Sequence, residues 1–299
     1  MSTRNKVHVM TALAKTLLLL LSLAVVVIAT LISVFDKHQE LLGCRYLFRA
    51  SKHPFVYASN IALSSRLSPT DIENLKIGQS RMTEMLRVLD SICIKNNVEY
   101  FAIGGTLLGA IAYKGWIPWD GDVDVEILKS DWSKLEGILQ TELPGNMWLQ
   151  TEKTDRHYRS WLPKFVMGKI RDLDSCYHNC QDGRRYHNGF MIDLNLYYFN
   201  SKDQLVIPDN NRVNYMYKHD VYPLRRVQFD NIWVNAPRNS EKYLERNYNS
   251  NFSEMLPRVM RYPHEGVLDP HNPCPHHREL YPQIYKKSGK RVKSPQTTS

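Results

Sequence analysis

Two aspartates that alternate with valines, in GDVDV at residues 121–125, constrain the fold of this chain more than any other feature. An ionised carboxylate inside an apolar strand loses its hydration, so it needs a compensating partner. Side chains two residues apart on a strand point to the same side. Asp122 and Asp124 therefore project together, while the valines face the core. The pattern predicts a strand over residues 123–127 that presents two carboxylates to a cation.

A glycine turn precedes this strand, and a second strand with a third carboxylate follows it. Gly104 and Gly105 end a short apolar run, and the helix expected over residues 106–113 would point its first N–H groups at a phosphate. Residues 190–199 alternate between two faces, with Asp193 on the polar face. If the two strands are neighbours, these groups make a phosphoryl-transfer site in which Mg²⁺ or Mn²⁺ neutralises the phosphate. A lone Asp-x-Asp is usually a solvated turn, so the prediction depends on the ordered combination.

The remaining periodicity predicts an α+β domain around a mixed sheet. Apolar residues recur at helical spacing over residues 68–96, and the Ser-Pro pair at the start of this segment is typical of a helix N-terminus. Shorter helices are expected over residues 131–139 and 243–248, and a buried strand over residues 100–103. Strands and helices do not alternate in regular βαβ units, which favours this class over a doubly wound sheet.

The N-terminal part contains an uncharged run, TLLLLLSLAVVVIATLISVF. Its length is about the 20 residues that a helix needs to cross a bilayer. A cleaved signal peptide is the alternative, but its apolar part is usually only about 7–15 residues long, and no clear cleavage site follows here. We predict a cytosolic tail (1–15), a transmembrane anchor (16–35), a stem (36–66), a catalytic domain (67–262) and a Pro/His-rich, basic C-terminal tail (263–299).

Basic residues flank both ends of the predicted anchor, so their count alone does not fix its orientation. We expect a single-pass type II protein of the Golgi or endoplasmic reticulum membrane, with the catalytic domain in the lumen. A possible glycosylation sequon at Asn251 would agree with that compartment. The net charge of +9 suits anionic lipid, phosphorylated substrates, acidic glycans or nucleic acid. A lumenal domain would be separated from any template, so no nucleic-acid partner is expected.

Five cysteines are present, and an odd number leaves at least one without a partner in the chain. In a lumenal domain, Cys176 and Cys180 would be close enough in sequence to form a local disulfide. Alternatively, these cysteines with His178, and with His187 or the CPHH group at residues 274–277, would assemble a zinc site. The spacing is not that of a standard zinc finger, so a disulfide or free thiols are favoured.

The segment GGTLLGAIAYKGWIPWDGDVDVEI, residues 104–127, resembles the hallmark of the LicD family, whose eukaryotic relatives include fukutin and fukutin-related protein. The segments KFVMGKIRD (164–172), NGFMIDLNLYYF (188–199) and VQFDNIWVNAPRNSEKYLERNYNSNF (227–252) are similar to that family as well. The resemblance covers about residues 68–252. It implies the nucleotidyltransferase fold shared with DNA polymerase β, a mixed sheet flanked by helices, preceded here by a single transmembrane helix.

The resemblance also implies roles for the acidic residues. Asp122 and Asp124 match the metal-binding pair, and Asp193 matches the third carboxylate. Asp120 matches an acidic position in the Trp-Asp turn, near the metal and the substrate. Gly121 stands where the family usually has another Asp, which thins the acidic cluster.

Further positions match the part of the family that binds the donor. Gly104, Gly105 and Thr106 would border the donor phosphates. Lys169 and Arg171 match a basic strand segment that would hold the donor's diphosphate, the arginine in bidentate fashion.

Known members of the family transfer phosphocholine or alditol phosphate from a CDP-linked donor to a glycan. The resemblance therefore implies a Mg²⁺- or Mn²⁺-dependent phosphotransferase, in which a glycan hydroxyl attacks the donor's β-phosphorus and releases CMP. The same fold also permits nucleotidyl transfer, with attack at the α-phosphorus. A glycan-binding pseudoenzyme is a third alternative, to which the Gly121 departure gives some weight.

Overall fold

The computed structural model of the chain describes residues 67–158, 166–178, 187–208, 212–248, 263 and 266–287. The predicted anchor and stem, the possible sequon and the end of the basic tail lie outside these residues. Among the described residues, no helix combines the length and the apolar character that crossing a bilayer requires.

Helices and strands are mixed along the described chain. The helices are α3 (Pro69–Asn96), α4 (Gly104–Tyr113), α5 (Trp132–Glu142), α6 (Lys218–Val221), α7 (Ser240–Tyr248), α8 (Pro275–Leu280) and α9 (Pro282–Lys287), and η1 (Lys129–Asp131) is a 3₁₀ turn. The strands are β1 (Tyr100–Ala102), β2 (Val123–Leu128), β3 (Met147–Thr151), β4 (Val166–Asp172), β5 (Cys176–His178), β6 (Met191–Phe199), β7 (Gln204–Ile207), β8 (Arg212–Tyr217), β9 (Arg225–Phe229), β10 (Ile232–Ala236) and β11 (Val267–Asp269). Within the described residues, the helices and strands predicted above are found, with ends shifted by a few residues.

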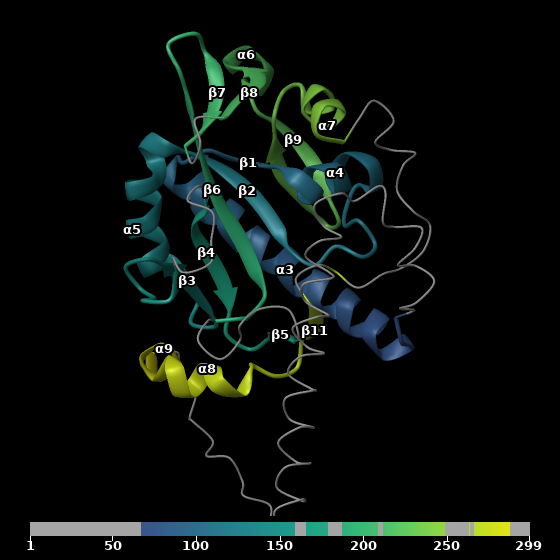
Figure 1. Cartoon of the computed structure of the whole chain (residues 1–299), viewed down its shortest axis with the longest axis vertical. Coiled ribbons are helices and arrows are strands. Elements are labelled where there is room, and N and C mark those ends of the chain that lie inside the picture. Colours follow the sequence, from purple (N-terminus) through teal and green to yellow (C-terminus); the bar gives the residue numbers. More distant parts are fainter. Residues whose placement is uncertain are drawn as a thin grey trace, which may run out of the picture.

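The main sheet has the strand order β1-β2-β6-β4-β3, and β7 and β8 extend it from β6. β2 and β6 run parallel, whereas the other neighbours in the sheet run antiparallel. The sheet is curled, α3 crosses behind it and α5 lies beside β3 (Figure 1). The predicted α+β class, a mixed sheet with flanking helices, is confirmed.

The parallel pair β2 and β6 buries one face in the core. Val123, Val125, Ile192 and Leu194 are all 0% exposed, and burying a side chain of this size stabilises the fold by about 1.5–3 kcal/mol. A slip of one residue in register would move this apolar set to the other face. The core therefore fixes which side chains of β2 and β6 point to the polar face.

The long helix α3 begins where the sequence predicts. Ser68 accepts a hydrogen bond from the Asp71 backbone N–H, Asp71 bonds back to the Ser68 backbone, and Pro69 is the first helical residue. Such a cap contributes about 1 kcal/mol. The buried face of α3 includes Met82 and Leu86, both 0% exposed, so the predicted packing of one helix face on the core is confirmed.

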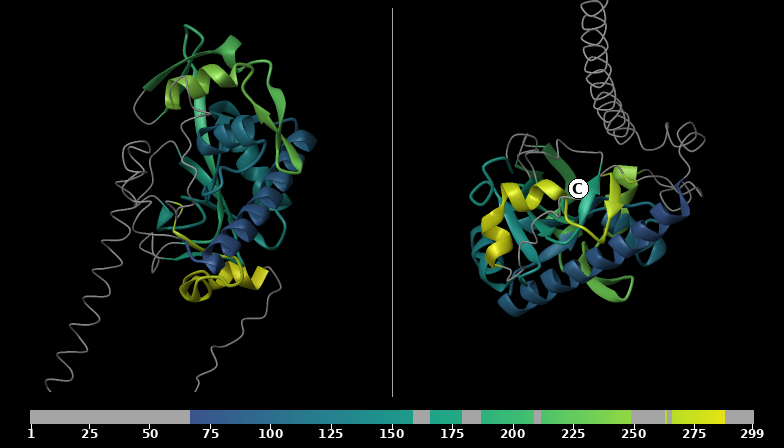
Figure 2. Two further views of the ribbon diagram at one scale, coloured as in Figure 1. Left: turned by 90° about the vertical axis from the view of Figure 1, so that its right-hand side faces the viewer. Right: turned by 90° about the horizontal axis from the view of Figure 1, so that it is seen from below.

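Residues 266–287 fold back onto the domain and are called the C-terminal clamp below. β11 pairs with β5, and α8 and α9 lie beneath the lower ends of β3 and β4 (Figures 1 and 2). Tyr281, Ile284 and Tyr285 form a small apolar cluster with Leu173, which follows β4. This stretch, which the sequence placed in a tail, is thus part of the folded body.

Candidate active site

Four polar side chains form a row across the sheet, called the polar row below. Asp124 of β2 is the register partner of Asp193 on β6, Asp193 is the partner of Lys169 on β4, and Lys169 is the partner of Gln150 on β3. Residues paired in this way project from the same face of a sheet. Asp122 lies directly before β2, two residues ahead of Asp124. The structure therefore brings Asp124 and Asp193 together on neighbouring strands, with Asp122 at the start of the first of them.

The first two residues of α4, Gly104 and Gly105, are glycines that make room for carboxylates. A Cβ on Gly105 would lie 2.5 Å from Oδ2 of Asp120, and a Cβ on Gly104 would lie 3.3 Å from Oδ2 of Asp124. Gly104 also has a φ of +54°, which side chains with a Cβ adopt at a cost. Thr106 accepts a hydrogen bond from the Asp124 backbone N–H at 2.9 Å. Both carboxylates thus lie against the first turn of α4, where the helix dipole favours anions.

The Trp-Asp turn that carries Asp120 is fixed from behind by two elements. Gln79 of α3 donates its side-chain N–H to the backbone oxygens of Ile117, at 3.2 Å, and Asp120, at 2.9 Å. Tyr177 of β5 donates its hydroxyl to the backbone oxygen of Gly121 at 2.5 Å. Because these donors come from remote segments, the position of the turn depends on the whole fold.

Lys169 lies on Asp193. Its ammonium group contacts both oxygens of that carboxylate, at 2.5 Å and 2.7 Å, and the sulfur of Met191 at 3.1 Å. The two residues are only 2% and 8% exposed. The sequence predicted Lys169 as a ligand of the donor's diphosphate, and the structure places it as the counter-ion of the third carboxylate.

Arg171 lies in the interior, 1% exposed. Its Nε donates to the Gln150 side-chain oxygen at 2.7 Å, and its Nη1 donates to the Gly189 backbone oxygen at 2.8 Å. The Gln150 side-chain nitrogen donates in turn to the Asp155 carboxylate. That carboxylate also accepts from the hydroxyl of Tyr281, the residue between α8 and α9. Arg171 therefore joins the sheet to the segment before β6 and, through Gln150, to the clamp, rather than lying beside the carboxylates of β2.

Two more polar residues on these strands were not singled out from the sequence. Glu126 extends the alternation of Asp122 and Asp124 by one step, and Asn195 does the same for Asp193. Asn195 donates to Oδ1 of Asp124 at 3.3 Å. Glu126 is buried, and burial, followed by the nearby Asp124 charge, raises its pKa to about 8. Its Oε2 has no hydrogen-bond partner among the described residues. The period-two pattern was the signal that would have found both residues.

Two tyrosines of α7 close the site from another direction. Tyr243 accepts a hydrogen bond from the Gly104 backbone N–H at 3.3 Å. Burial raises the pKa of Tyr248, and the charges of Asp120, Asp124 and Asp122 raise it further, so this phenol lies close to the carboxylates. The sequence predicted α7 only as a helix, because helical spacing does not say what a helix covers.

Asp122 and Asp124 fit a hard divalent cation. The donor atoms that these residues and Glu126 offer are oxygens, which Mg²⁺ and Mn²⁺ prefer. A Cβ on Gly104 or Gly105 would crowd the Asp124 and Asp120 carboxylates, and the buried Oε2 of Glu126 has no hydrogen-bond partner among the described residues. The oxygen donors are of the type that the predicted metal prefers, and the metal itself stays a prediction.

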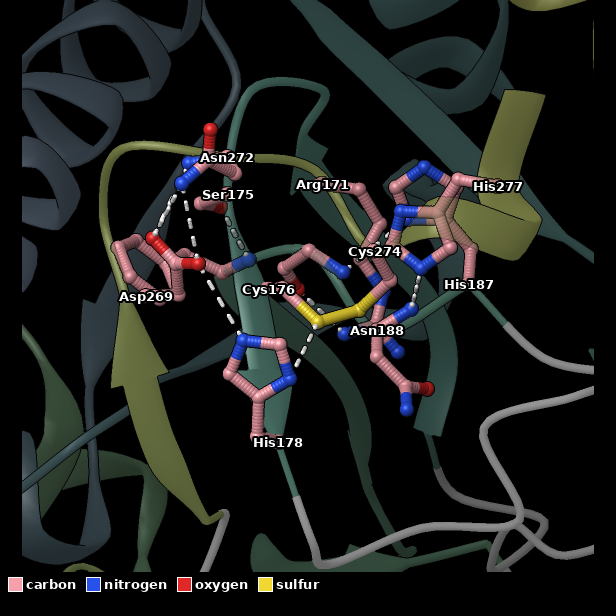
Figure 3. The surroundings of a disulfide bond; sticks show 12 residues. Arg171, Ser175, Cys176, His178, His187, Asn188, Asp269, Asn272, Cys274 and His277 are labelled. Carbon is pink, nitrogen blue, oxygen red and sulfur yellow. Dashed lines mark hydrogen bonds and ion pairs between the residues drawn. A yellow bond between two sulfur atoms is a disulfide. The ribbon is translucent and has the colours of Figure 1, made fainter. Parts of the chain in front are cut away.

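The cysteines pair differently from the prediction. Cys176 of β5 forms a disulfide with Cys274, directly before α8, with 5.0 Å between their Cα atoms (Figure 3). The expected local bridge from Cys176 to Cys180 is wrong, because the pairing of β5 with β11 brings the more distant cysteine close. Cys93 is free and buried in the core.

Two histidines support the clamp as neutral rings. The Asn188 backbone N–H donates to Nε2 of His277 at 2.8 Å, and the Gly189 backbone N–H donates to Nδ1 of His187 at 3.2 Å. The rings stack with 3.9 Å between their centroids. Burial lowers both pKa values, that of His277 to about 2. Cys274, His276 and His277 lie close enough to share a metal, but the Cys274 sulfur is bonded to Cys176, so of the alternatives the structure favours the disulfide.

Comparisons with known proteins agree with the resemblance seen in the sequence. Residues 97–239 match the family described as LicD/FKTN/FKRP, nucleotidyltransferase domain. An uncharacterized protein of Rickettsia prowazekii is 26% identical over 186 residues, which cover 61% of this chain and 60% of that protein. The lipopolysaccharide cholinephosphotransferase LicD of Haemophilus influenzae is 26% identical over 164 residues, 52% of this chain and 55% of that protein.

The matches leave part of each relative uncovered, since the chain spans 60% and 55% of the length of these two curated relatives. Among solved structures, that of ANT(2″)-Ia in complex with adenylyl-2″-tobramycin is similar over 58% of this chain and 87% of its own chain. The sequence identity is 8% and the TM-score is 0.33. That score is too low to support an inference. The resemblance to the LicD family is confirmed over residues 97–239.

Proposed function

We propose that this chain, a transferase that carries the LicD/FKTN/FKRP domain over residues 97–239, moves a phosphorylated headgroup from a CDP-linked donor to a glycan hydroxyl. The headgroup is phosphocholine or an alditol phosphate. The domain has a nucleotidyltransferase-type fold, and the reaction depends on Mg²⁺ or Mn²⁺. A single N-terminal helix anchors the protein in the Golgi or endoplasmic reticulum membrane, with the domain in the lumen.

One observation carries the proposal. Asp124 and Asp193 are register partners on two parallel strands, beside a helix start where a Cβ on Gly105 would lie 2.5 Å from the Asp120 carboxylate. Carboxylates gathered at this density repel one another unless a cation lies between them. A phosphate bound through that cation would face the first N–H groups of α4.

In the proposed reaction Asp122 and Asp124 would hold a divalent ion, which would neutralise charge on the donor's diphosphate. Gly104 and Gly105 let the diphosphate approach the backbone of α4, and Thr106 holds Asp124 in place by accepting its backbone N–H. The acceptor oxygen forms a bond to the β-phosphorus and loses its proton to solvent, the bond from that phosphorus to the bridging oxygen breaks, and CMP leaves with that oxygen. The protein's contribution is positioning and electrostatics, as in phosphoryl transfer generally.

Product analysis tests this proposal. The full chain, purified in detergent, is incubated with Mn²⁺, a glycan acceptor and either CDP-choline or a CDP-alditol, and the products are identified by mass spectrometry. We expect CMP and a glycan heavier by one phosphorylated headgroup. Asp124→Asn should abolish both products. Asp203→Asn is the matched control, because Asp203 is exposed with a φ of +56°, where Asn is tolerated.

The alternatives give different products. A glycan that gains a nucleoside monophosphate would indicate nucleotidyl transfer. Glycan binding without nucleotide binding would indicate a pseudoenzyme. Turnover that Asp124→Asn leaves unimpaired would rule out the proposed site.

A further inference from the structure

The ammonium group of Lys169 is already bound to a carboxylate of the protein, unlike that of a lysine that is free to bind a phosphate. Its ammonium group contacts both oxygens of Asp193, at 2.5 Å and 2.7 Å. The side chains of the pair are 3% and 12% exposed. Its other described contact, the Met191 sulfur at 3.1 Å, carries no charge. One cation thus engages the whole carboxylate on the side of β4.

The neighbour of Lys169 on the other side does not compete for it. Gln150 is its register partner on β3, but the Gln150 side-chain oxygen accepts from Arg171 at 2.7 Å and the side-chain nitrogen donates to Asp155 at 2.6 Å. Both ends of this amide are therefore engaged elsewhere. The ammonium group is directed to Asp193, towards the carboxylates of β2.

Asp193 is where a second ion would have to bind. Two-ion phosphoryl-transfer sites place their ions about 3.5–4 Å apart, which requires carboxylates on adjacent positions. Asp124 and Asp193 are adjacent, but a second ion on Asp193 would have to separate a buried ion pair. That would leave an ammonium charge without solvent or partner, which is strongly unfavourable.

We propose that Lys169 takes the place of a second divalent cation, so that the site binds one ion, on Asp122 and Asp124, while Asp193 carries the ammonium group. Lys169 cancels the charge of Asp193. The charges of Asp122 and Asp124, with that of Asp120 against the first turn of α4, remain for the ion. The inference rests on the proposed function in assuming that this ion binds.

Counting bound ions tests the inference without an activity assay. Mn²⁺ is titrated into the full chain and into variants, and free Mn²⁺ is measured by electron paramagnetic resonance. The wild type should bind one tight Mn²⁺ per chain. Lys169→Met removes the charge but keeps the length of the side chain, and it should bind two. Lys153→Met is the matched control, since Lys153 is a surface lysine with a side chain 73% exposed that pairs with Glu136, and it should bind one.

A double variant guards against misfolding. Lys169→Met combined with Asp193→Asn removes both charges of the buried pair at once, so neither is left without a partner. This variant should bind one Mn²⁺ within about tenfold of the wild-type affinity, a difference of about 1.4 kcal/mol. Circular dichroism and the unfolding midpoint confirm that each variant is folded.

The outcomes separate the two proposals. Two tight ions in the wild type, or one in a folded Lys169→Met, would overturn the role of Lys169 and leave the proposed function standing. Loss of the single ion in the double variant would make Asp193 a metal ligand and would also overturn it. A wild type that binds no Mn²⁺ would overturn the inference and the metal dependence of the proposed function together.

Discussion

The polar row and the C-terminal clamp both bury titratable side chains next to β4 and β6, but they bury them in opposite states. In the polar row, Lys169 and Asp193 form a buried ion pair. At the clamp, burial lowers the pKa values of His277 and of His187, whose ring stacks on that of His277. Both rings are therefore neutral and accept backbone N–H groups. A buried charge changes the electrostatic potential at the place where a charged ligand binds. A neutral ring that accepts backbone hydrogen bonds only stabilises the local backbone. Changes in the row should therefore affect binding and catalysis, and changes in the clamp should affect stability.

The largest effect is expected for Asp124→Asn. Losing the ion's charge stabilisation removes several kcal/mol from the transition state, so the transfer rate should fall on the order of 10³-fold. The free energy of unfolding should change by less than about 1 kcal/mol, since the amide keeps the shape of the side chain. CMP release and urea denaturation measure the two quantities. An Asp124→Asn variant that unfolds more easily but turns over normally would show that the polar row supports stability and not catalysis.

The clamp is tested by Cys176→Ser combined with Cys274→Ser. Removing a disulfide that joins residues 98 apart should lower the free energy of unfolding by about 2–5 kcal/mol. The transfer rate, measured well below the unfolding temperature, should stay within about threefold of wild type, because the disulfide lies in the clamp and the proposed chemistry on β2. A thiol reductant should bring the wild type to the stability of the variant and leave the variant unchanged. Loss of activity at full stability would show that the clamp belongs to the site.

An intermediate effect is expected for Gly105→Ala. The new Cβ would lie 2.5 Å from the Asp120 carboxylate, so the turn must shift, and a displacement of this kind typically lowers the rate by about 10–100-fold. Gly137→Ala is the matched control, because nothing lies within 4 Å of a Cβ there. In helix α5 it should raise the free energy of unfolding by roughly 0.5–1 kcal/mol. Equal activities of the two variants would show that the glycine cradle is not needed.

The smallest effect is a difference in pH dependence. His187 and His277 have pKa values lowered on folding from 6.5, so their contribution to stability is present above pH 6.5 and is lost as the pH falls. Each contributes at most about 1.4 kcal/mol per pH unit. Glu126 acts in the opposite sense: its pKa is raised from 4.5 to about 8, so it reduces stability as the pH rises between these values.

The difference between wild type and His277→Gln isolates the contribution of one ring. Urea denaturation between pH 5.5 and 6.5 should show a weaker loss of stability in the variant than in the wild type. His219→Gln is the control, because the His219 side chain is 74% exposed, and it should follow the wild type. If the free energy of unfolding changed equally with pH in the wild type and in His277→Gln, the clamp histidine would not be buried as a neutral ring.

The local parts of the polar row could be predicted from the sequence. Alternation of carboxylates with valines placed Asp122 and Asp124 on one face, and the same alternation placed Asp193 on the polar face of its strand. Whether the two strands are neighbours depends on a parallel pairing between segments some 70 residues apart, Asp124 with Asp193. Only the resemblance to the LicD family indicated that pairing.

The contacts between side chains on different strands, and the disulfide between distant cysteines, could not be predicted. The resemblance to the LicD family implied that Lys169 and Arg171 would hold the donor's diphosphate. Their actual partners are set by the register of β4 with β6 and β3. Spacing likewise favoured Cys180 as the partner of Cys176, while the pairing of β5 with β11 brings Cys274. Period-two and period-3.6 patterns report which face a residue occupies, but not which strand lies beside it.

The most direct test of the account is a thermal-shift titration of the full chain with CDP and CMP, each with and without Mn²⁺. At a ligand concentration of about 100 times Kd, binding should stabilise the fold by about 2.7 kcal/mol, which raises Tm by roughly 5–10 °C for a domain of this size. The account predicts a shift that requires Mn²⁺ and is lost when Asp122→Asn and Asp124→Asn are combined. A shift that survives in this double variant, or no shift with either nucleotide in a well-folded protein, would contradict a metal-dependent cytidine-nucleotide site on β2.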